Sequence, residues 1–237
     1  MTGFPPAPVF PALLLLALAP LAGLALAHML PRWLGRDPLW RARARFCPYR
    51  RSLPLACLGV TAVLMLAGPS PFTVPFVTTA LTAVWLWLLL ALILTDLIAY
   101  RLPDVATASL LAVALAKALT LALLAAMDPL WPLAGALFGS SSFLLIRWAY
   151  QALRGREGLG LGDVKLMAGI GAGIGAGIGP LWLPHLVLLA ACLCLLWALG
   201  QTLRRRPPAA DQPLPFGAAL CLAAIVLTLG RIHWGGH

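Results

Sequence analysis

The chain has 237 residues, of which 62% are hydrophobic and only 10% charged, and its formal net charge is +10. Soluble domains carry about 25% charged residues, so this composition excludes an ordinary soluble domain and predicts an integral membrane protein. The positive charge does not indicate a nucleic-acid partner, because the basic residues lie in short segments between apolar runs, which is how membrane orientation is encoded.

Eight apolar segments follow one another along the chain, and they predict an all-α, polytopic bundle of about eight transmembrane helices. A helix needs about 20 apolar residues to cross the hydrocarbon core of a bilayer. The predicted spans are 9–30, 53–68, 76–95, 105–127, 130–153, 164–179, 181–203 and 214–230. The second and sixth are short, and the sixth is either a complete span or a half-span.

The distribution of arginine sets the expected orientation. No basic residue precedes the first apolar segment, and seven arginines follow it between Arg32 and Arg51. A secretory signal has a different arrangement, so we expect a retained first helix and a cytoplasmic arginine-rich loop. The other basic loops contain Arg101, Arg154, Arg156, Arg204, Arg205 and Arg206. The alternate loops carry no Lys or Arg, so both termini are expected outside, which requires an even number of spans.

Two aspartates lie at the ends of predicted spans. Asp96 closes the third span and Asp163 opens the sixth, and the expected orientation puts both at the cytoplasmic end. An ionisable group in a transmembrane segment costs about 2.5–3.5 kcal/mol at mid-helix and less near the ends, so it is a functional candidate. We expect the two carboxylates to meet in one candidate catalytic site. Taken singly, Asp96 could instead pair with Arg101, and Asp163 could be a helix N-cap.

Asp163 ends a glycine-rich stretch that begins at Gly158. The stretch is not a dinucleotide-binding fingerprint, because no strand precedes it and the glycine spacing differs. Gly160 and Gly162 remove side chains beside Asp163, which would let an extended peptide approach the carboxylate and let the backbone turn. The alternative is a flexible loop that leads into the helix.

Two further features of the spans bear on packing. The sixth span contains six alternate glycines from Gly169 to Gly179, in two sets with four-residue spacing. This spacing permits close helix–helix approach in lipid, so the helix that carries Asp163 could pack tightly against the one that carries Asp96. Lys117 lies in the middle of the fourth span, where it either faces a polar cavity or extends towards the interface.

Other candidate residues lie at predicted helix starts. Asp104 follows Pro103 at the beginning of the fourth helix, where a carboxylate offsets exposed amide groups. Pro215-Phe-Gly217 reads as a turn followed by the start of the last helix. The five cysteines include no C-x-x-C pair, so no zinc site or redox motif is predicted.

Three of these elements, taken together, resemble a known family. Gly160-Leu-Gly-Asp163 followed by Val-Lys-Leu resembles the GxGD signature of type IV prepilin peptidases. Asp96, with Leu102-Pro-Asp104 shortly after it, is similar to that family's first aspartate region, and Leu214-Pro-Phe-Gly217 resembles its later Pro-Phe-Gly element. The resemblance implies a membrane aspartic endopeptidase with Asp96 and Asp163 as the catalytic pair. It implies substrate-binding or site-supporting roles for Gly160, Gly162, Asp104, Lys165, Pro215, Phe216 and Gly217.

The resemblance also implies a substrate and a location. The expected reaction removes leader peptides from type IV prepilins or type II secretion pseudopilins at the cytoplasmic face of the bacterial inner membrane, after a glycine that precedes a hydrophobic helix. The expected partners are that substrate and the lipid bilayer, with no nucleic acid, and the oligomeric state is left open. Residues 1–75 would form N-terminal membrane helices with an arginine-rich cytoplasmic loop, and residues 76–237 the GxGD peptidase core.

The chain departs from the family pattern near its start. Many members carry two C-x-x-C pairs in the first cytoplasmic loop, whereas this loop holds only Cys47. The family's Gly-Ser-Phe-Leu-Asn stretch is also missing, because Gly23–Leu30 reads Gly-Leu-Ala-Leu-Ala-His-Met-Leu. This region is linked in the family to N-methylation of the product, so methyl transfer, which would need S-adenosylmethionine, is in doubt. No other cofactor and no metal is expected.

A pair of carboxylates suggests a mechanism. Two carboxylates held close in a site of low dielectric share one proton. The ionised member would take a proton from the attacking water, and the protonated member would donate to the scissile carbonyl oxygen. The alternatives are a proton- or cation-coupled transporter that uses both aspartates and Lys117, a structural subunit of a secretion or pilus machine, and a peptidase with presenilin-like breadth of substrates.

Overall fold

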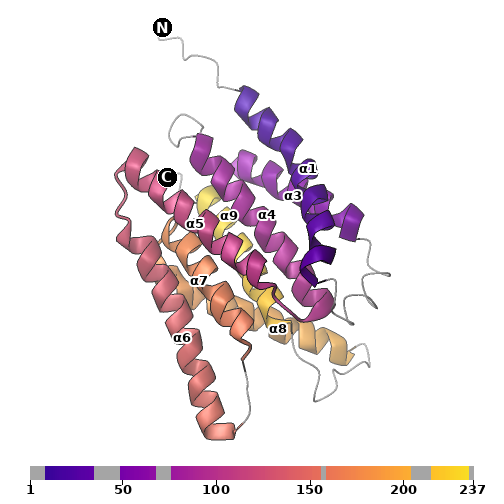
Figure 1. Cartoon of the computed structure of the whole chain (residues 1–237), viewed down its shortest axis with the longest axis vertical. Helices are drawn as coiled ribbons and strands as arrows, with labels where there is room; N and C mark the ends of the chain where they lie inside the picture. The colour runs from indigo at the N-terminus through magenta and orange to yellow at the C-terminus, as the bar shows by residue number, and fades with distance from the viewer. Residues whose placement is uncertain (1–8, 35–48, 68–75, 156–158, 204–214, 235–237) are drawn as a thin grey trace.

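The computed structural model of the protein describes residues 9–34, 49–67, 76–155, 159–203 and 215–234. Within these ranges every regular element is helical, and the helices form one bundle (Figure 1). The elements are α1 (Val9–Leu34), α3 (Tyr49–Ala67), α4 (Phe76–Ala99), α5 (Asp104–Ala125), α6 (Leu130–Arg154), α7 (Leu161–Gly175), the 3₁₀ helix η1 (Pro180–Trp182), α8 (Leu183–Leu203) and α9 (Phe216–Trp234). The predicted all-α fold class is confirmed, and each predicted span coincides with a helix.

The helices have the length and composition of a membrane bundle. In the described part of the chain, five stretches are long and apolar enough to cross a bilayer: 12–34, 76–99, 104–125, 130–154 and 180–203. Shorter apolar stretches lie in α3 and α9. Many large apolar side chains are exposed on the outside of these helices, as expected where lipid and not water is the surrounding solvent. The chain is therefore a helical membrane protein.

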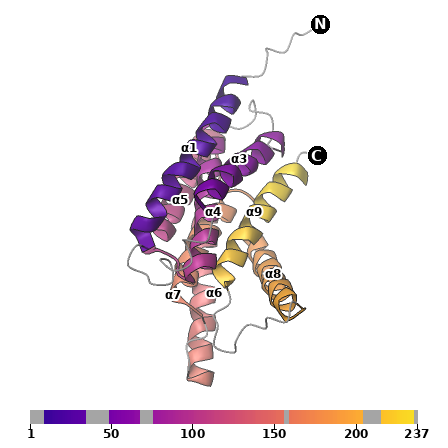
Figure 2. The ribbon, with the colours of Figure 1, turned by 90° about the vertical axis from the view of Figure 1, so that its right-hand side faces the viewer.

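The arrangement places α4 and α7 inside the bundle. α4 contacts α1, α3, α5 and α9, whereas α7 lies against α5, α6 and α9. α6 extends beyond the other helices at the lower end of the molecule, and α7 returns beside it (Figures 1 and 2). α1 begins and α9 ends near the opposite, upper end (Figure 2), as an even number of passes requires.

Glycines let α6 and α7 touch along their backbones. A Cβ added to Gly135 of α6 would overlap the carbonyl oxygen of Gly171, and a Cβ on Gly171 would overlap that of Gly135. One turn further along, a Cβ on Gly175 would lie 2.5 Å from the carbonyl oxygen of Trp131. Small residues at four-residue spacing are the usual means of close helix approach in lipid. The packing predicted from the glycine repeat is confirmed at these positions.

Other glycines of α7 face the helices on its remaining sides. A Cβ on Gly169 would lie 2.9 Å from Leu110 Cδ2 of α5, and one on Gly173 would overlap the Trp85 ring of α4. Trp85 also donates from Nε1 to the Gly169 carbonyl oxygen over 3.4 Å. The helix that carries Asp163 therefore contacts the helix that carries Asp96 through the Trp85 side chain, whereas its close backbone approach is to α6.

We expect Gly171→Ala to destabilise the protein strongly, because the new methyl group would meet backbone of α6 that no side-chain rotation can move. Thermal unfolding in detergent, followed by circular dichroism, should show a lower midpoint than for the parent. The matched control is Gly200→Ala in α8, where nothing lies within 4 Å of the added Cβ. Equal midpoints for the two variants would show that close α6–α7 contact is unnecessary.

Lys117 is buried inside the bundle. Its side chain is 5% exposed, and Nζ donates to the Gly173 carbonyl oxygen over 3.4 Å. Nζ also lies 5.8 Å from the centroid of the Trp85 ring. Gly173 belongs to the last turn of α7, where carbonyl groups lack helical partners and a cation is favoured. Lys117 therefore stabilises the end of α7.

The bounds of α7 differ from the prediction. The helix begins at Leu161 instead of Val164, because Gly160 takes the extended N-cap conformation and the Asp163 N–H already donates to the Gly160 carbonyl oxygen over 3.2 Å. It ends at Gly175, and Gly179, at φ +92°, turns the chain into η1. At 1.5 Å per residue, α7 is about 22 Å long and falls short of the hydrocarbon core of about 30 Å.

Candidate active site

The structure brings Asp96 and Asp163 together beside α9. Asp96 lies in the last turn of α4, and Asp163 in the first turn of α7. A Cβ built on Gly217 of α9 would lie 3.2 Å from Asp96 Oδ2 and 3.2 Å from Asp163 Oδ1. One oxygen of each carboxylate thus flanks the same point, which only a glycine leaves open. Three helices that are distant in sequence meet at this position.

Asp96 is held by the start of α9. Its side chain is 6% exposed, and the Ala218 N–H donates to Oδ2 over 2.7 Å. Ala218 is in the first turn of α9, whose N–H groups have no partner within the helix. The positive end of the helix dipole favours a carboxylate at this place. Sequence reasoning missed the Ala218 N–H, because a backbone donor leaves no residue-type signal.

Asp163 occupies the first turn of α7 and is half-buried. Its possible role as an N-cap is not borne out, because Gly160 has the N-cap position. A carboxylate in the first helical turn still interacts favourably with the exposed N–H groups there. Both carboxylates therefore lie at helix N-termini, Asp163 in its own helix and Asp96 at a neighbouring one, and this offsets part of the cost of burying them.

Each residue of the Pro-Phe-Gly element has a distinct contact. Pro215 is buried at the start of α9, and its carbonyl oxygen accepts from the Ala219 N–H over 3.3 Å. The Phe216 ring stacks on Phe143 of α6, with centroids 6.1 Å apart. Gly217 faces both carboxylates. The element thus starts α9, anchors it to α6 and leaves room for the aspartates, whereas Leu214 lies outside the described residues.

The glycines before Asp163 differ from each other. The added Cβ of Gly160 would meet only the Asp163 side chain, at 3.7 Å from Oδ2, and the Gly162 nitrogen, and Gly160 is exposed. A Cβ on Gly162 would instead lie 3.3 Å from Leu102 Cβ. The Leu102 side chain therefore lies against Gly162 in this structure, and the substrate-binding role of Gly162 stays a prediction.

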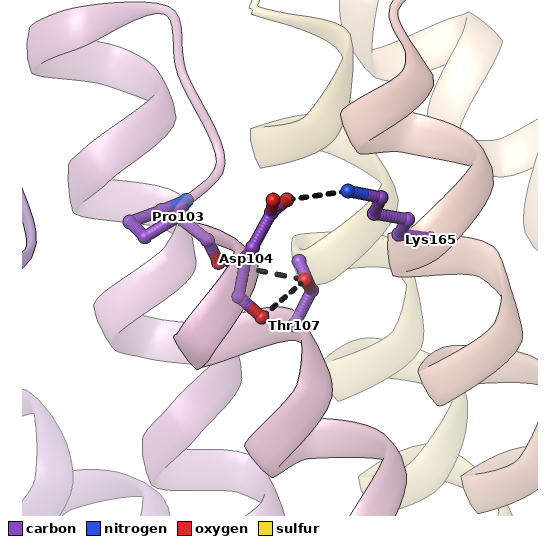
Figure 3. A network of polar contacts seen from close by, with 4 residues as sticks. All are labelled: Pro103, Asp104, Thr107 and Lys165. Carbon is purple, nitrogen blue, oxygen red and sulfur yellow. Dashed lines mark hydrogen bonds and ion pairs between the residues drawn. The ribbon is translucent and has the colours of Figure 1, made fainter.

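Asp104 and Lys165 lie beside each other at the surface (Figure 3). Lys165 Nζ is 2.7 Å from Asp104 Oδ1, and the two side chains are 51% and 75% exposed. Asp104 is in the first turn of α5, as predicted, but no side chain caps this helix through a hydrogen bond, because its N-cap residue is Pro103. The pair links the starts of α5 and α7.

We expect Lys165→Met to lower the free energy of unfolding by no more than about 1 kcal/mol, because an exposed ion pair is largely screened by solvent. Thermal unfolding in detergent at low and high salt measures this contribution. A decrease in the free energy of unfolding well above that value, and independent of salt, would contradict this expectation. It would show that the ion pair contributes substantially to the stability of the fold.

Arg147 of α6 is a further residue that sequence reasoning missed. It is half-buried, and its guanidinium donates to the carbonyl oxygen of Leu159, just before the glycine that caps α7. In the sequence, Arg147 is only a charged residue near the end of a predicted span. Its contact with Leu159 could not be predicted, because it depends on how α6 and α7 pack together. Arg147 thereby ties the GxGD segment to α6.

In the described part of the chain, no group of three or more His, Cys, Asp or Glu residues could hold a metal ion. Cys47 and the other residues of the first loop, 35–48, lie outside the described residues. What the described site offers is a carboxylate pair, backbone N–H groups that donate to it and an apolar surround. Such a site can move protons between water and a bound amide.

The fold and this site define a helical membrane protein in which a buried and a half-buried carboxylate converge. Comparison with known families matches residues 83–199 to the type IV leader peptidase family, a range that includes both aspartates. Leader peptidase HopD of Escherichia coli is 36% identical over 126 residues, which is 53% of this chain and 77% of HopD. The chain therefore belongs to the type IV leader peptidase family, and the resemblance seen in the sequence is confirmed.

Longer relatives are similar over more of the chain. The prepilin leader peptidase/N-methyltransferase of Aeromonas hydrophila is 33% identical over 200 residues, 83% of this chain and 64% of that protein. The protein of the same name from Pseudomonas aeruginosa is 36% identical over 149 residues, 63% of this chain and 47% of that protein. The chain thus spans less than two thirds of these two relatives. No solved structure matches it.

Proposed function

We propose that this protein is an aspartic endopeptidase of the bacterial inner membrane that removes the leader peptide from type IV prepilins or type II secretion pseudopilins. The observation that carries the proposal is that one Asp96 oxygen and one Asp163 oxygen both lie 3.2 Å from the point where a Cβ on Gly217 would stand. The peptidase family and the printed names of the relatives supply the reaction class and the substrate class.

In the proposed reaction the two carboxylates share one proton. The ionised member takes a proton from a water molecule, and the water oxygen attacks the scissile carbonyl carbon. The protonated member gives its proton to the carbonyl oxygen. The proton taken from water then passes to the leaving nitrogen as the C–N bond breaks. At the same time the other carboxylate takes back a proton from a hydroxyl of the tetrahedral intermediate as the carbonyl group re-forms. The pair thus returns to its shared-proton state, with a new carboxylic acid and amine formed. Asp96 and Asp163 are the catalytic residues in this proposal.

The distribution of charge supports a cytoplasmic position for the site. Arg101 follows α4, and Arg154 ends α6, at the same end of the bundle as both aspartates. The positive-inside rule assigns such loops to the cytoplasm. Leader peptides of a substrate that still faces the cytoplasm would reach the carboxylates there. The arginine-rich loop at 35–48 lies outside the described residues.

Methyl transfer stays outside the proposed activity. The match covers only 64% of the Aeromonas hydrophila protein and 47% of the Pseudomonas aeruginosa protein, and the printed names of both include N-methyltransferase. The first loop of this chain holds a single cysteine, Cys47, and lacks the paired cysteines of many members. A requirement for S-adenosylmethionine is accordingly not part of the proposal.

A transporter that uses the aspartates together with Lys117 is less consistent with the geometry. Lys117 contacts Gly173, which lies about 15 Å further along α7 than Asp163. The lysine and the carboxylates therefore form no common cluster. Both aspartates lie at one end of the bundle, whereas coupling sites of transporters lie near the midplane.

The proposal is tested by incubating the purified protein in detergent with a prepilin and S-adenosylmethionine, followed by mass analysis of the products. We expect a leader peptide and a shortened pilin whose mass carries no added methyl group. An intact prepilin after long incubation, together with proton or cation flux in liposomes that hold the protein, would favour the transporter instead. A methylated product would show that the activity is broader than proposed.

A further inference from the structure

Leu102 and the two aspartates approach the same point beside Gly217. A Cβ built on Gly217 would be 3.1 Å from Leu102 Cδ1, and the same point is 3.2 Å from an oxygen of Asp96 and of Asp163. The side chain is partly buried and packs against the core. An apolar methyl group thus lies at the edge of the carboxylate pair, on a residue that belongs to neither aspartate's helix.

The backbone around Leu102 is held at both ends. Tyr100 ends α4 with a left-handed φ of +52°, and its N–H donates to the Asp96 carbonyl oxygen over 2.9 Å. A non-glycine residue in this conformation costs about 1–2 kcal/mol, so it persists where the surroundings require it. Pro103 restricts the backbone of Leu102, the residue before it, and is the N-cap of α5. Leu102 is therefore positioned by a short, constrained connection.

Two glycines make the space that Leu102 occupies. A Cβ on Gly162 of α7 would lie 3.3 Å from Leu102 Cβ and 3.4 Å from its Cδ1. A Cβ on Gly217 of α9 would lie 3.1 Å from the same Cδ1. Leu102 thus packs against glycines of two helices that both border the carboxylates.

We propose that Leu102 is a specificity-determining residue that limits the size of the substrate side chain next to the cleaved bond. The inference rests on the proposed peptidase function. A scissile carbonyl carbon has to lie within about 3–3.5 Å of the attacking water between the carboxylates. The Cα atoms on either side of that bond are about 3.8 Å apart, so both flanking side chains would start close to the carboxylates, and we infer that one of them meets Leu102 Cδ1. Small side chains fit beside Leu102, and larger ones collide with it.

The expected size of the effect follows from steric selection in other enzymes. One methylene group more or less in an apolar pocket changes specificity by about 10–200-fold. The parent enzyme should therefore cut a substrate with alanine at the selected position at least about tenfold more slowly than one with glycine, and valine more slowly still. Replacement of Leu102 by alanine should reduce the preference for the glycine substrate over the alanine substrate by a similar factor.

The experiment uses the purified full-length protein and a set of prepilins that carry Gly, Ala or Val at each of the two residues flanking the cleaved bond. We measure kcat/KM for the parent and for Leu102→Ala on every substrate. For Leu102→Ala we expect the ratio of kcat/KM for the alanine substrate to kcat/KM for the glycine substrate to rise about tenfold or more at one flanking position. At the other position this ratio should not change. Val105→Ala is the matched control, because Val105 is exposed at the start of α5, and it should keep the parent profile.

Two outcomes would overturn the inference. A Leu102→Ala enzyme with the parent's ratios at both positions, or one whose rates change by the same factor for every substrate, shows that Leu102 does not select side chains. Should Leu102→Ala fail to accumulate in membranes, Leu102→Val removes less volume and must give a smaller shift in the same direction. If the parent enzyme cuts no prepilin, the proposed function itself is overturned. Unchanged ratios for Leu102→Ala overturn only the role of Leu102.

Discussion

Asp163→Asn is expected to lower prepilin cleavage by about 10²–10⁴-fold, with Asp96→Asn giving a loss of the same order. Asparagine has nearly the size and shape of aspartate, but its amide neither accepts a proton from water nor donates one as a carboxylic acid does. The Ala218 N–H can still donate to the side-chain oxygen at position 96, so the packing around the site should persist. Initial cleavage rates of each purified variant give the measurement.

The matched control for both variants is Asp128→Asn. Asp128 lies between α5 and α6, where one of its oxygens accepts from the Leu130 N–H over 2.9 Å, and it is exposed. Asp128 lies at the opposite end of α5 from the carboxylate pair. The Asp128→Asn enzyme should therefore cleave prepilin at the parent's rate. Both site variants should also insert into membranes and unfold at temperatures near the parent's. Normal cleavage by Asp163→Asn would refute the catalytic role of that residue.

Gly217→Ala is expected to reduce kcat by about 10²-fold with little loss of membrane insertion. The added methyl group would lie 3.2 Å from an oxygen of each aspartate and 3.1 Å from Leu102, closer than these groups can remain. The carboxylates have to move apart, and a misplacement of about 1 Å in a reacting group can cost about 10²-fold in rate. The methyl group also occupies the point that both carboxylates face.

The control for this variant lies on the same helix. Gly230 of α9 is exposed, and nothing is within 4 Å of a Cβ added there. Gly230→Ala should keep the parent's activity and slightly raise stability, since alanine favours a helix over glycine by up to about 1 kcal/mol. If Gly217→Ala retains full kcat, the space between the carboxylates is not where the reaction takes place.

The sequence predicted the fold and the identity of the paired aspartates because both depend on strong local signals. Long apolar runs determine which segments cross the membrane, and Asp96 and Asp163 stand out as charges at the ends of such runs. The four-residue glycine repeat likewise predicted close packing of α7, which Gly171 and Gly175 show against α6. These signals need no knowledge of which helices become neighbours.

The features that the sequence did not predict depend on which segments meet. The Ala218 N–H donates to Asp96 only because α9 begins beside the end of α4. Leu102 reaches Gly162 and Gly217 because the left-handed Tyr100 turns the chain back over the site. A leucine in a short loop and a backbone amide are too common in sequences to mark a site by themselves.

The start of α7 shows a competition between two local tendencies. Alternate glycines before Asp163 suggested a loop, because glycine is a poor helix former. The structure begins the helix at Leu161 and places Gly162 inside its first turn. Leu102 packs on Gly162 there, and Asp163 interacts with the exposed N–H groups of the turn. Tertiary packing thus overrides the low helix propensity of glycine at this point.

The joint action of the two carboxylates is tested most directly by comparing kcat/KM for Asp96→Asn, Asp163→Asn and the double variant on one prepilin. Groups that act as a unit lose nearly all their effect when either is removed, so their losses are far from additive. We predict that the double variant cleaves about as slowly as the single ones. A double variant that loses the product of the two single effects would contradict a shared-proton pair, because each aspartate would then act independently.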